Sequence, residues 1–161
     1  MVRGLTDRQT QPVVDLVARD RAIDALCRVG ADDPQFAGVA IGADQKSLLL
    51  YRAEAETELP SSLDAAYRAC LPDDLPMSYR TAALSLMQVD ELRALVSAHL
   101  PAFAAAGMKV NAWGQRDGLS DPFTIYYSEG GQPPASLARV FDLFGTGTVE
   151  FAQGGVVRLE M

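Results

Sequence analysis

Three observations predict an α+β fold made of two tandem repeats, each with the order helix, strand, strand, helix, strand. First, stretches with apolar residues at helical spacing alternate with short strand-like runs. Second, this order of elements occurs twice along the 161 residues. Third, 48% apolar and 22% charged residues are typical of a globular protein. Each repeat is expected to form a small, mainly antiparallel sheet covered by its helices.

The first repeat is predicted over residues 11–86, after a flexible segment of residues 1–10. Its long helix has apolar side chains on one side and ends at Gly30, a typical C-terminal stop. In the hairpin that follows, Gly38 is expected to permit close packing or a bulge. The expected elements are a helix over 12–29, two strands within 36–53, a short helix within 59–72 and a strand over 77–84.

The second repeat is predicted over residues 87–161, and the two repeats are expected to pack as one compact unit. Its first helix carries an apolar stripe that includes His99 and Phe103. Pro101 is expected to kink or restart this helix, because an interior proline removes one backbone hydrogen bond. The expected elements are a helix over 87–107, strands over 109–115 and 122–129, a helix over 133–145 and one strand or a short hairpin over 148–160.

The spacing of the repeats follows from matching Ile41-Gly42 with Trp113-Gly114, which lie 72 residues apart. LLLYRAEAE then lies near FTIYYSEGG, and SSLDAAYRACL lies near PASLARVFDLF. A shared order of elements at one spacing indicates one supersecondary unit used twice.

Charge and hydropathy exclude several classes of partner. The net charge is −7 and only 14 basic residues are scattered along the chain, which argues against nucleic-acid binding. No run approaches the roughly 20 apolar residues of a membrane span, so no membrane association is expected. The first residues lack the apolar core of a secretory signal, and the sequence as given predicts a cytoplasmic protein.

No cofactor or metal is expected from the motifs. The segment GVAIGADQK lacks the Gly-Lys-Ser/Thr ending of a Walker motif, and a strand rather than a helix follows it. His99 is the single histidine, which excludes sites that need two imidazoles. His99 is also the one weak catalytic candidate, as a base beside Cys27, Cys70 or a serine. No nucleophile elbow is present, so a packing role for His99 is favoured over catalysis.

Aromatic residues concentrate in the second repeat and point to binding. Trp113, Tyr126 and Tyr127 lie in its predicted strands, and adjacent strand residues such as Tyr126 and Tyr127 point to opposite faces. One of these tyrosines is therefore expected at a surface. With His99, these three residues are the candidate binding residues, and the expected ligand is another protein or a peptide.

Three segments within residues 36–130 share their pattern with a known family: FAGVAIGADQKSLLLYRA, MSYRTAALSLMQVDELRALV and AGMKVNAWGQRDGLSDPFTIYYSE. They resemble the pro-regions of actinobacterial streptogrisin and alpha-lytic-type serine proteases. The resemblance is a likeness of pattern: a glycine-containing hairpin, a strand leading into a long helix, and a hairpin with a tryptophan. It implies a non-catalytic α+β module that helps to fold or inhibits a protease by sheet pairing.

Three functional hypotheses follow. The favoured one is a non-catalytic protein-binding or accessory module that acts through a sheet edge or the aromatic second repeat. The first alternative is a small enzyme or ligand-binding domain with a pocket between the repeats that contains His99. The second alternative is a self-associating structural protein in which strand edges pair between copies, so a homo-oligomer is also possible.

Overall fold

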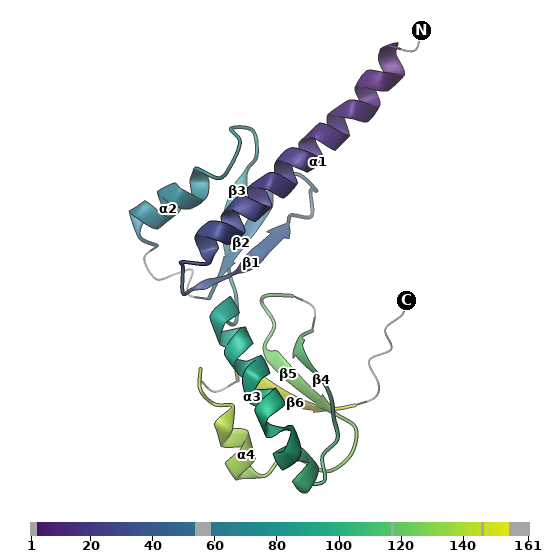
Figure 1. The fold of residues 1–161 in the computed structure, drawn as a ribbon, viewed down its shortest axis with the longest axis vertical. Helices are drawn as coiled ribbons and strands as arrows, with labels where there is room; N and C mark the ends of the chain where they lie inside the picture. Colours follow the sequence, from purple (N-terminus) through teal and green to yellow (C-terminus); the bar gives the residue numbers. More distant parts are fainter. Residues whose placement is uncertain (1–2, 54–58, 117, 146, 155–161) are drawn as a thin grey trace. The chain divides into compact units, whose positions relative to one another are not determined.

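The structure is a computed structural model that describes residues 3–53, 59–116, 118–145 and 147–154, with side chains from residue 16 onward. Within these ranges the predicted order of elements occurs twice (Figure 1). The α+β fold with repeated helix and strand units is confirmed. The first repeat contains α1 (Arg3–Gly30), β1 (Phe36–Ile41), β2 (Leu48–Arg52), α2 (Ser61–Arg68) and β3 (Met77–Thr81). The second contains α3 (Leu86–Ala105), β4 (Val110–Gln115), β5 (Phe123–Tyr127), α4 (Ala135–Val140) and β6 (Val149–Gln153).

Each repeat forms a three-stranded mixed sheet, with the orders β1-β2-β3 and β4-β5-β6. The first two strands of each sheet pair antiparallel, and the second and third strands pair parallel. The expectation of mainly antiparallel sheets is therefore corrected. A parallel pair needs a crossover connection, and the short helices α2 and α4 supply it.

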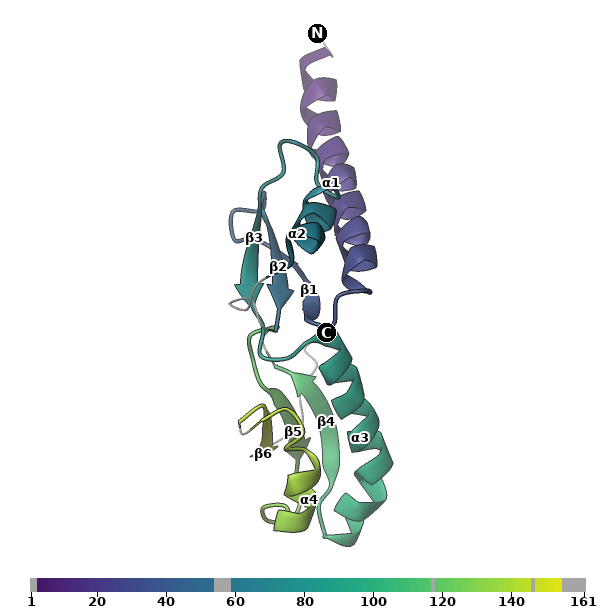
Figure 2. The same cartoon turned by 90° about the vertical axis from the view of Figure 1, so that its left-hand side faces the viewer.

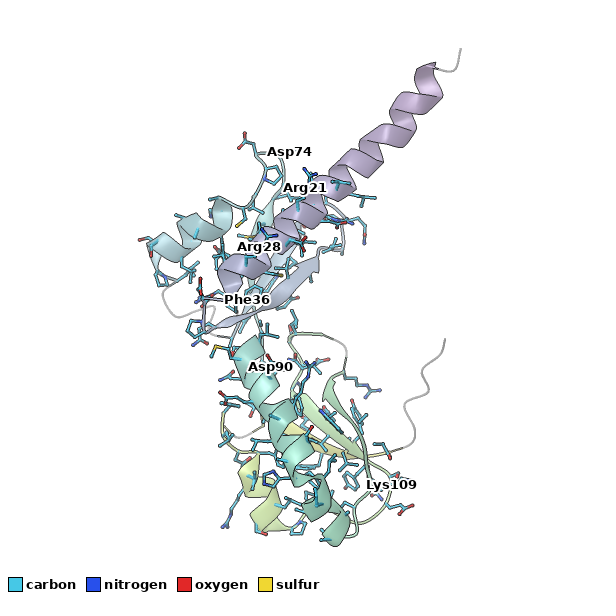
Figure 3. The ribbon with its side chains drawn as sticks, viewed as in Figure 1. Arg21, Arg28, Phe36, Asp74, Asp90 and Lys109 are labelled. Carbon is cyan, nitrogen blue, oxygen red and sulfur yellow. The ribbon has the colours of Figure 1, made fainter. Side chains whose placement is uncertain are left out.

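A β-bulge lies at the same place in both hairpins. In the first, Phe36 pairs with Arg52 and Gly38 with Tyr51; Figure 3 labels Phe36 at the start of β1. Gly38 has a φ of 154°, which other residues rarely adopt, so the glycine supports the bulge. In the second hairpin the bulge lies between residues 110 and 112.

The registers also correct the alignment of the two repeats. Central strands β2 and β5 begin at Leu48 and Phe123, which are 75 residues apart, whereas β3 and β6 begin 72 residues apart. Ile41 therefore corresponds to Gln115, and its predicted match with Trp113 is wrong by two residues. The spacing varies because the loops of the two repeats differ in length.

The chain divides into two compact units, residues 1–81 and 82–161. The boundary lies before the predicted one at 86, because Leu84 is buried in the core of the second unit. Ser85 caps α3 in a capping box with Gln88, which also ties this segment to the second unit. The packing of both repeats as one compact unit stays a prediction.

Helix α1 begins at Arg3 and therefore includes most of the segment, residues 1–10, that was expected to be flexible. The predicted start at Pro12 was based on the apolar stripe. Such a stripe indicates where a helix packs, and it does not indicate where the helix begins.

The later helices differ from the prediction in two ways. Pro101 lies inside α3, which continues through it, so the predicted restart is wrong and the predicted kink stays a prediction. Helix α4 ends at Val140, five residues before the predicted end at 145, and the next residue, Phe141, is fully buried in the core. Among the described residues, no helix has both the length and the apolar character that crossing a bilayer requires.

In each unit both helices pack on one face of the sheet (Figure 2). The core of the first unit consists of buried side chains from α1, β1, β2 and α2: Ala22, Leu26, Phe36, Leu48, Leu50 and Tyr67. The core of the second unit includes Phe103 of α3, Phe123 of β5 and Phe141 after α4. Among the residues that the structure describes, no helix of the same unit lies on the opposite face of either sheet.

Candidate functional site

The four predicted binding residues all lie in the second unit, but they are not brought together on one surface. Tyr127 is 3% exposed and belongs to the core, and Trp113 packs against the same core. Tyr126 lies on the opposite face of β5 and is half-buried. The alternation of strand residues predicted these opposite directions, and Tyr126 is the tyrosine at a surface.

His99 makes two local contacts. Its Nδ1 donates to the Leu95 carbonyl oxygen at 2.8 Å, and its ring meets Phe141 edge-on with centroids 5.9 Å apart. In the described part of the chain, no hydroxyl or thiol is hydrogen-bonded to His99 as a nucleophile would be. These contacts favour a packing role for His99.

The two cysteines lie in the first unit and neither is suited to nucleophilic catalysis. Burial, with a smaller contribution from Asp24, raises the pKa of the Cys27 thiol, and burial also raises the pKa of the Cys70 thiol. A thiol with a raised pKa is less ionised at neutral pH and is a weaker nucleophile. In the described residues, no group of three His, Cys, Asp or Glu side chains converges as a metal site would.

The helix-free sheet faces carry matching tyrosines. Tyr51 of β2 and Tyr126 of β5 each pair with the residue that follows the bulge in the neighbouring strand, Gly38 and Ala112. On its other side Tyr126 pairs with Ala152 of β6, so small side chains flank its ring. On the helix-free face of the second unit, Tyr126 therefore lies between two alanines of the neighbouring strands.

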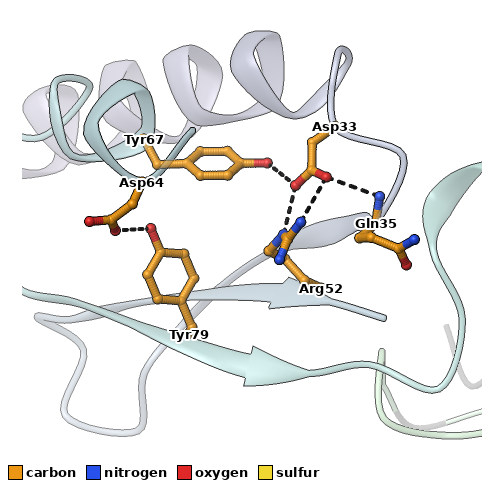
Figure 4. A network of polar contacts seen from close by, with 6 residues as sticks. All are labelled: Asp33, Gln35, Arg52, Asp64, Tyr67 and Tyr79. Atoms are coloured by element: carbon orange, nitrogen blue, oxygen red, sulfur yellow. Dashed lines mark hydrogen bonds and ion pairs between the residues drawn. The ribbon is translucent and has the colours of Figure 1, made fainter. Parts of the chain in front are cut away.

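The first unit also contains a buried polar network that the sequence did not reveal (Figure 4). Arg52 Nε and Nη2 donate to Asp33 Oδ2 and Oδ1 at 2.8 and 3.0 Å. The Tyr67 hydroxyl donates to Oδ2 at 2.7 Å, and the Gln35 main-chain N–H donates to Oδ1 at 3.0 Å. The Asp33 and Arg52 side chains are only 1% and 6% exposed, so the network closes one end of the core.

Electrostatics keep Asp33 ionised in this network. Burial raises the pKa of the Asp33 carboxyl, but its hydrogen-bond donors lower it by more, and the net pKa lies below its ordinary value. The bond to Asp33 raises the pKa of Arg52. Burial and the bond to Asp33 raise the pKa of the Tyr67 hydroxyl. All three groups therefore keep one protonation state near neutral pH, which suits a structural role better than acid–base catalysis.

A second polar link lies beside the first. The Tyr79 hydroxyl donates to Asp64 Oδ1 at 2.6 Å, and Arg68 Nε donates to the same oxygen at 3.1 Å. Burial and the bond to Asp64 raise the pKa of Tyr79. The Arg68 and Asp64 side chains are 54% and 37% exposed, so this ion pair is weaker than the buried one.

The first unit also holds a cavity of about 510 Å³. It lies where α1, the β1–β2 turn and the loop before β3 meet, and its lining includes Arg19, Lys46 and Asp74. His99 does not line it. No local sequence pattern indicates this cavity, because its three wall segments are far apart along the chain.

Comparisons with known proteins do not identify a family for this chain. No family model matches the sequence, and no curated protein is similar to it. Two solved structures are weakly similar: the periplasmic domain of the T3SS inner membrane protein PrgH from S. typhimurium, and a second structure of the PrgH periplasmic domain. Their TM-scores are 0.29 and 0.28 at 14% and 12% identity. Each match covers 81% of this chain and about two thirds of the other (67% and 66%).

Proposed function

We propose that this chain is a non-catalytic protein-binding module, and that a partner protein docks on the helix-free sheet face around Tyr126. The observation that carries the proposal is the position of Tyr126, an aromatic ring between Ala112 and Ala152 on a face without a helix. Tyrosine combines a large apolar body with a polar tip, and it is enriched where proteins bind one another.

The repeat supports the same proposal. Tyr51 occupies the matching register in the first unit, so the duplicated scaffold presents a tyrosine on its free face twice. The partner is expected to offer a basic surface, because the net charge of this chain is −7 and Glu150 lies exposed on the same face as Tyr126. The resemblance to protease pro-regions makes a serine protease one candidate partner.

Site-specific photo-crosslinking tests the proposal. A benzophenone amino acid placed at position 126, or at 51, should form a discrete adduct in an extract of the source organism. The matched control carries the probe at Ala98, an exposed position on α3. Adducts of equal yield from position 98, or none from 126 and 51, would contradict the proposal.

The mass of the adduct separates the proposed function from its alternative. An adduct of this chain with a different protein supports a binding module. An adduct made only between two copies of this chain would replace the proposal with self-association.

A further inference from the structure

The cavity of the first unit combines apolar walls with a few charged groups. Leu16 and Leu75 line it beside the charged side chains of Arg19, Lys46 and Asp74. Its volume of about 510 Å³ lies within the range of small-molecule sites. Leu16 is 44% exposed, so apolar surface at this cavity is open to a ligand.

Arg19 lines this cavity, and its guanidinium is only partly hydrogen-bonded. Its Nη1 donates to the Gln45 carbonyl oxygen at 3.3 Å, whereas its Nε is buried and has no hydrogen-bond partner among the described residues. A buried donor without a partner is costly, and a guanidinium is matched best by the paired oxygens of a carboxylate. The guanidinium is therefore only partly paired, and an anionic group in the cavity would be matched by the N–H donors that Arg19 has left at its open side.

The turn that forms one wall is held in place before any ligand binds. Asp44 Oδ1 accepts from the main-chain N–H groups of Lys46 and Ser47, each at 2.9 Å. Gln45 has a φ of 63°, a conformation that costs free energy for a residue other than glycine. Because these bonds fix the turn, Lys46 already lines the cavity, and ligand binding requires no rearrangement of the backbone there.

The charges of the lining favour an anion. Arg19 and Lys46 are cationic and Asp74 is anionic, so the lining is net positive in a chain whose net charge is −7. Figure 3 labels Asp74 in the loop beside α1. A ligand with one carboxylate and an apolar body would meet both the cations and the leucines.

We propose that this cavity binds a carboxylate attached to an apolar body. The shared chemistry occurs in two sources, a medium-chain fatty acid and the C-terminal carboxylate of an apolar peptide. This site lies in the first unit and does not depend on the docking face around Tyr126.

Titrations followed by amide NMR signals test the proposal on the full chain, with octanoate and acetyl-Leu-Leu as the two probes. At least one probe should shift the signals of residues 16–19, 45–46 and 72–75 saturably, and which one does so identifies the source. The neutral controls, octanol and acetyl-Leu-Leu amide, should bind about tenfold more weakly.

Three variants complete the experiment. Arg19→Gln should weaken binding about tenfold, and Lys46→Gln should weaken it a few-fold. Arg21→Gln is the matched control, because Arg21 is exposed on the same helix and does not line the cavity. The proposal is overturned if neither probe binds saturably, if the neutral controls bind as well as the acids, or if folded Arg19→Gln and Lys46→Gln variants bind like the native chain.

Discussion

The two units place different chemistry at three matching positions of one fold. The first position is the last residue of the central strand, and the second is the seventh residue after the N-cap proline of the short helix. The third is the buried residue in the loop that follows the long helix. These positions hold Arg52, Tyr67 and Asp33 in the first unit and Tyr127, Phe141 and Met108 in the second. The first unit closes its core with an ion pair, and the second closes it with aromatic and apolar packing.

The fold is therefore compatible with either a buried ion pair or apolar packing at these positions. The stability of each unit should respond to different changes. Asp33 and Arg52 are each stable in the core only while the other is present, since an unpaired buried charge is strongly destabilising. In the second unit Phe141 stacks on Phe103 and meets Phe151 edge-on, at centroid distances of 5.7 and 5.9 Å. The first unit should therefore respond to charge and pH, and the second to side-chain volume.

The largest effect is expected from Asp33→Asn, which leaves the Arg52 guanidinium buried without its counter-ion. The free energy of unfolding of the first unit should fall by about 3–5 kcal/mol. Urea unfolding followed by the amide NMR signals of each unit measures it. The adjacent Asp32→Asn is the control, because Asp32 is exposed; an equal loss in both variants would contradict the buried ion pair.

The second-largest effect is expected from acid, which should lower the free energy of unfolding of the first unit. The folded-state pKa of Asp33 lies below its ordinary value of 3.8, so the ion pair stabilises fully above about pH 4. That stabilisation is lost as the pH falls through the folded-state pKa. Urea unfolding at about pH 3 and pH 6 should show a larger loss in the native chain than in Asp33→Asn. An identical pH dependence of the two chains would show that Asp33 is not the titrating group.

A smaller effect is expected from Tyr67→Phe, which gives the first unit the residue that the second unit has at this position. The loss of one hydrogen bond to a carboxylate should cost about 1.5–3 kcal/mol of unfolding free energy. Tyr79→Phe removes a hydroxyl bonded to the more exposed Asp64, and it should cost about 1 kcal/mol or less. If Tyr79→Phe lowered the unfolding free energy in urea by more than Tyr67→Phe, the stronger hydrogen bond would be the one made by Tyr79.

A small net effect is also expected when the whole network is exchanged. The triple variant Asp33→Met, Arg52→Tyr, Tyr67→Phe carries the three residues of the second unit, and it leaves no unpaired charge. Its unfolding free energy should stay within about 2 kcal/mol of the native value, because apolar replacements of buried ion pairs are often neutral or stabilising. A loss as large as that of Asp33→Asn would mean that the two units do not share these packing positions.

Part of the network could be predicted from strand alternation. In β2, Leu48 and Leu50 are buried, and Arg52 has the same parity, which indicates a cation on the core face. Strand alternation could not identify Asp33 as the partner of Arg52. Asp33 lies in a loop 19 residues earlier, where an aspartate is typical of a turn. The same alternation separated Tyr126 from Tyr127, and the apolar stripe of the long helix favoured a packing role for His99. No local pattern indicated that Trp113 would pack against the core.

The sequence by itself determined the order of the elements, their repetition and the opposite directions of Tyr126 and Tyr127. These features follow from backbone periodicity and turn residues, which act over a few neighbouring positions. Only the tertiary structure decided that β2 pairs parallel with β3, that Asp33 meets Arg52 and that Arg19 reaches the turn at Gln45. These contacts join residues that are distant in the chain, and they depend on loop paths that no local periodicity encodes.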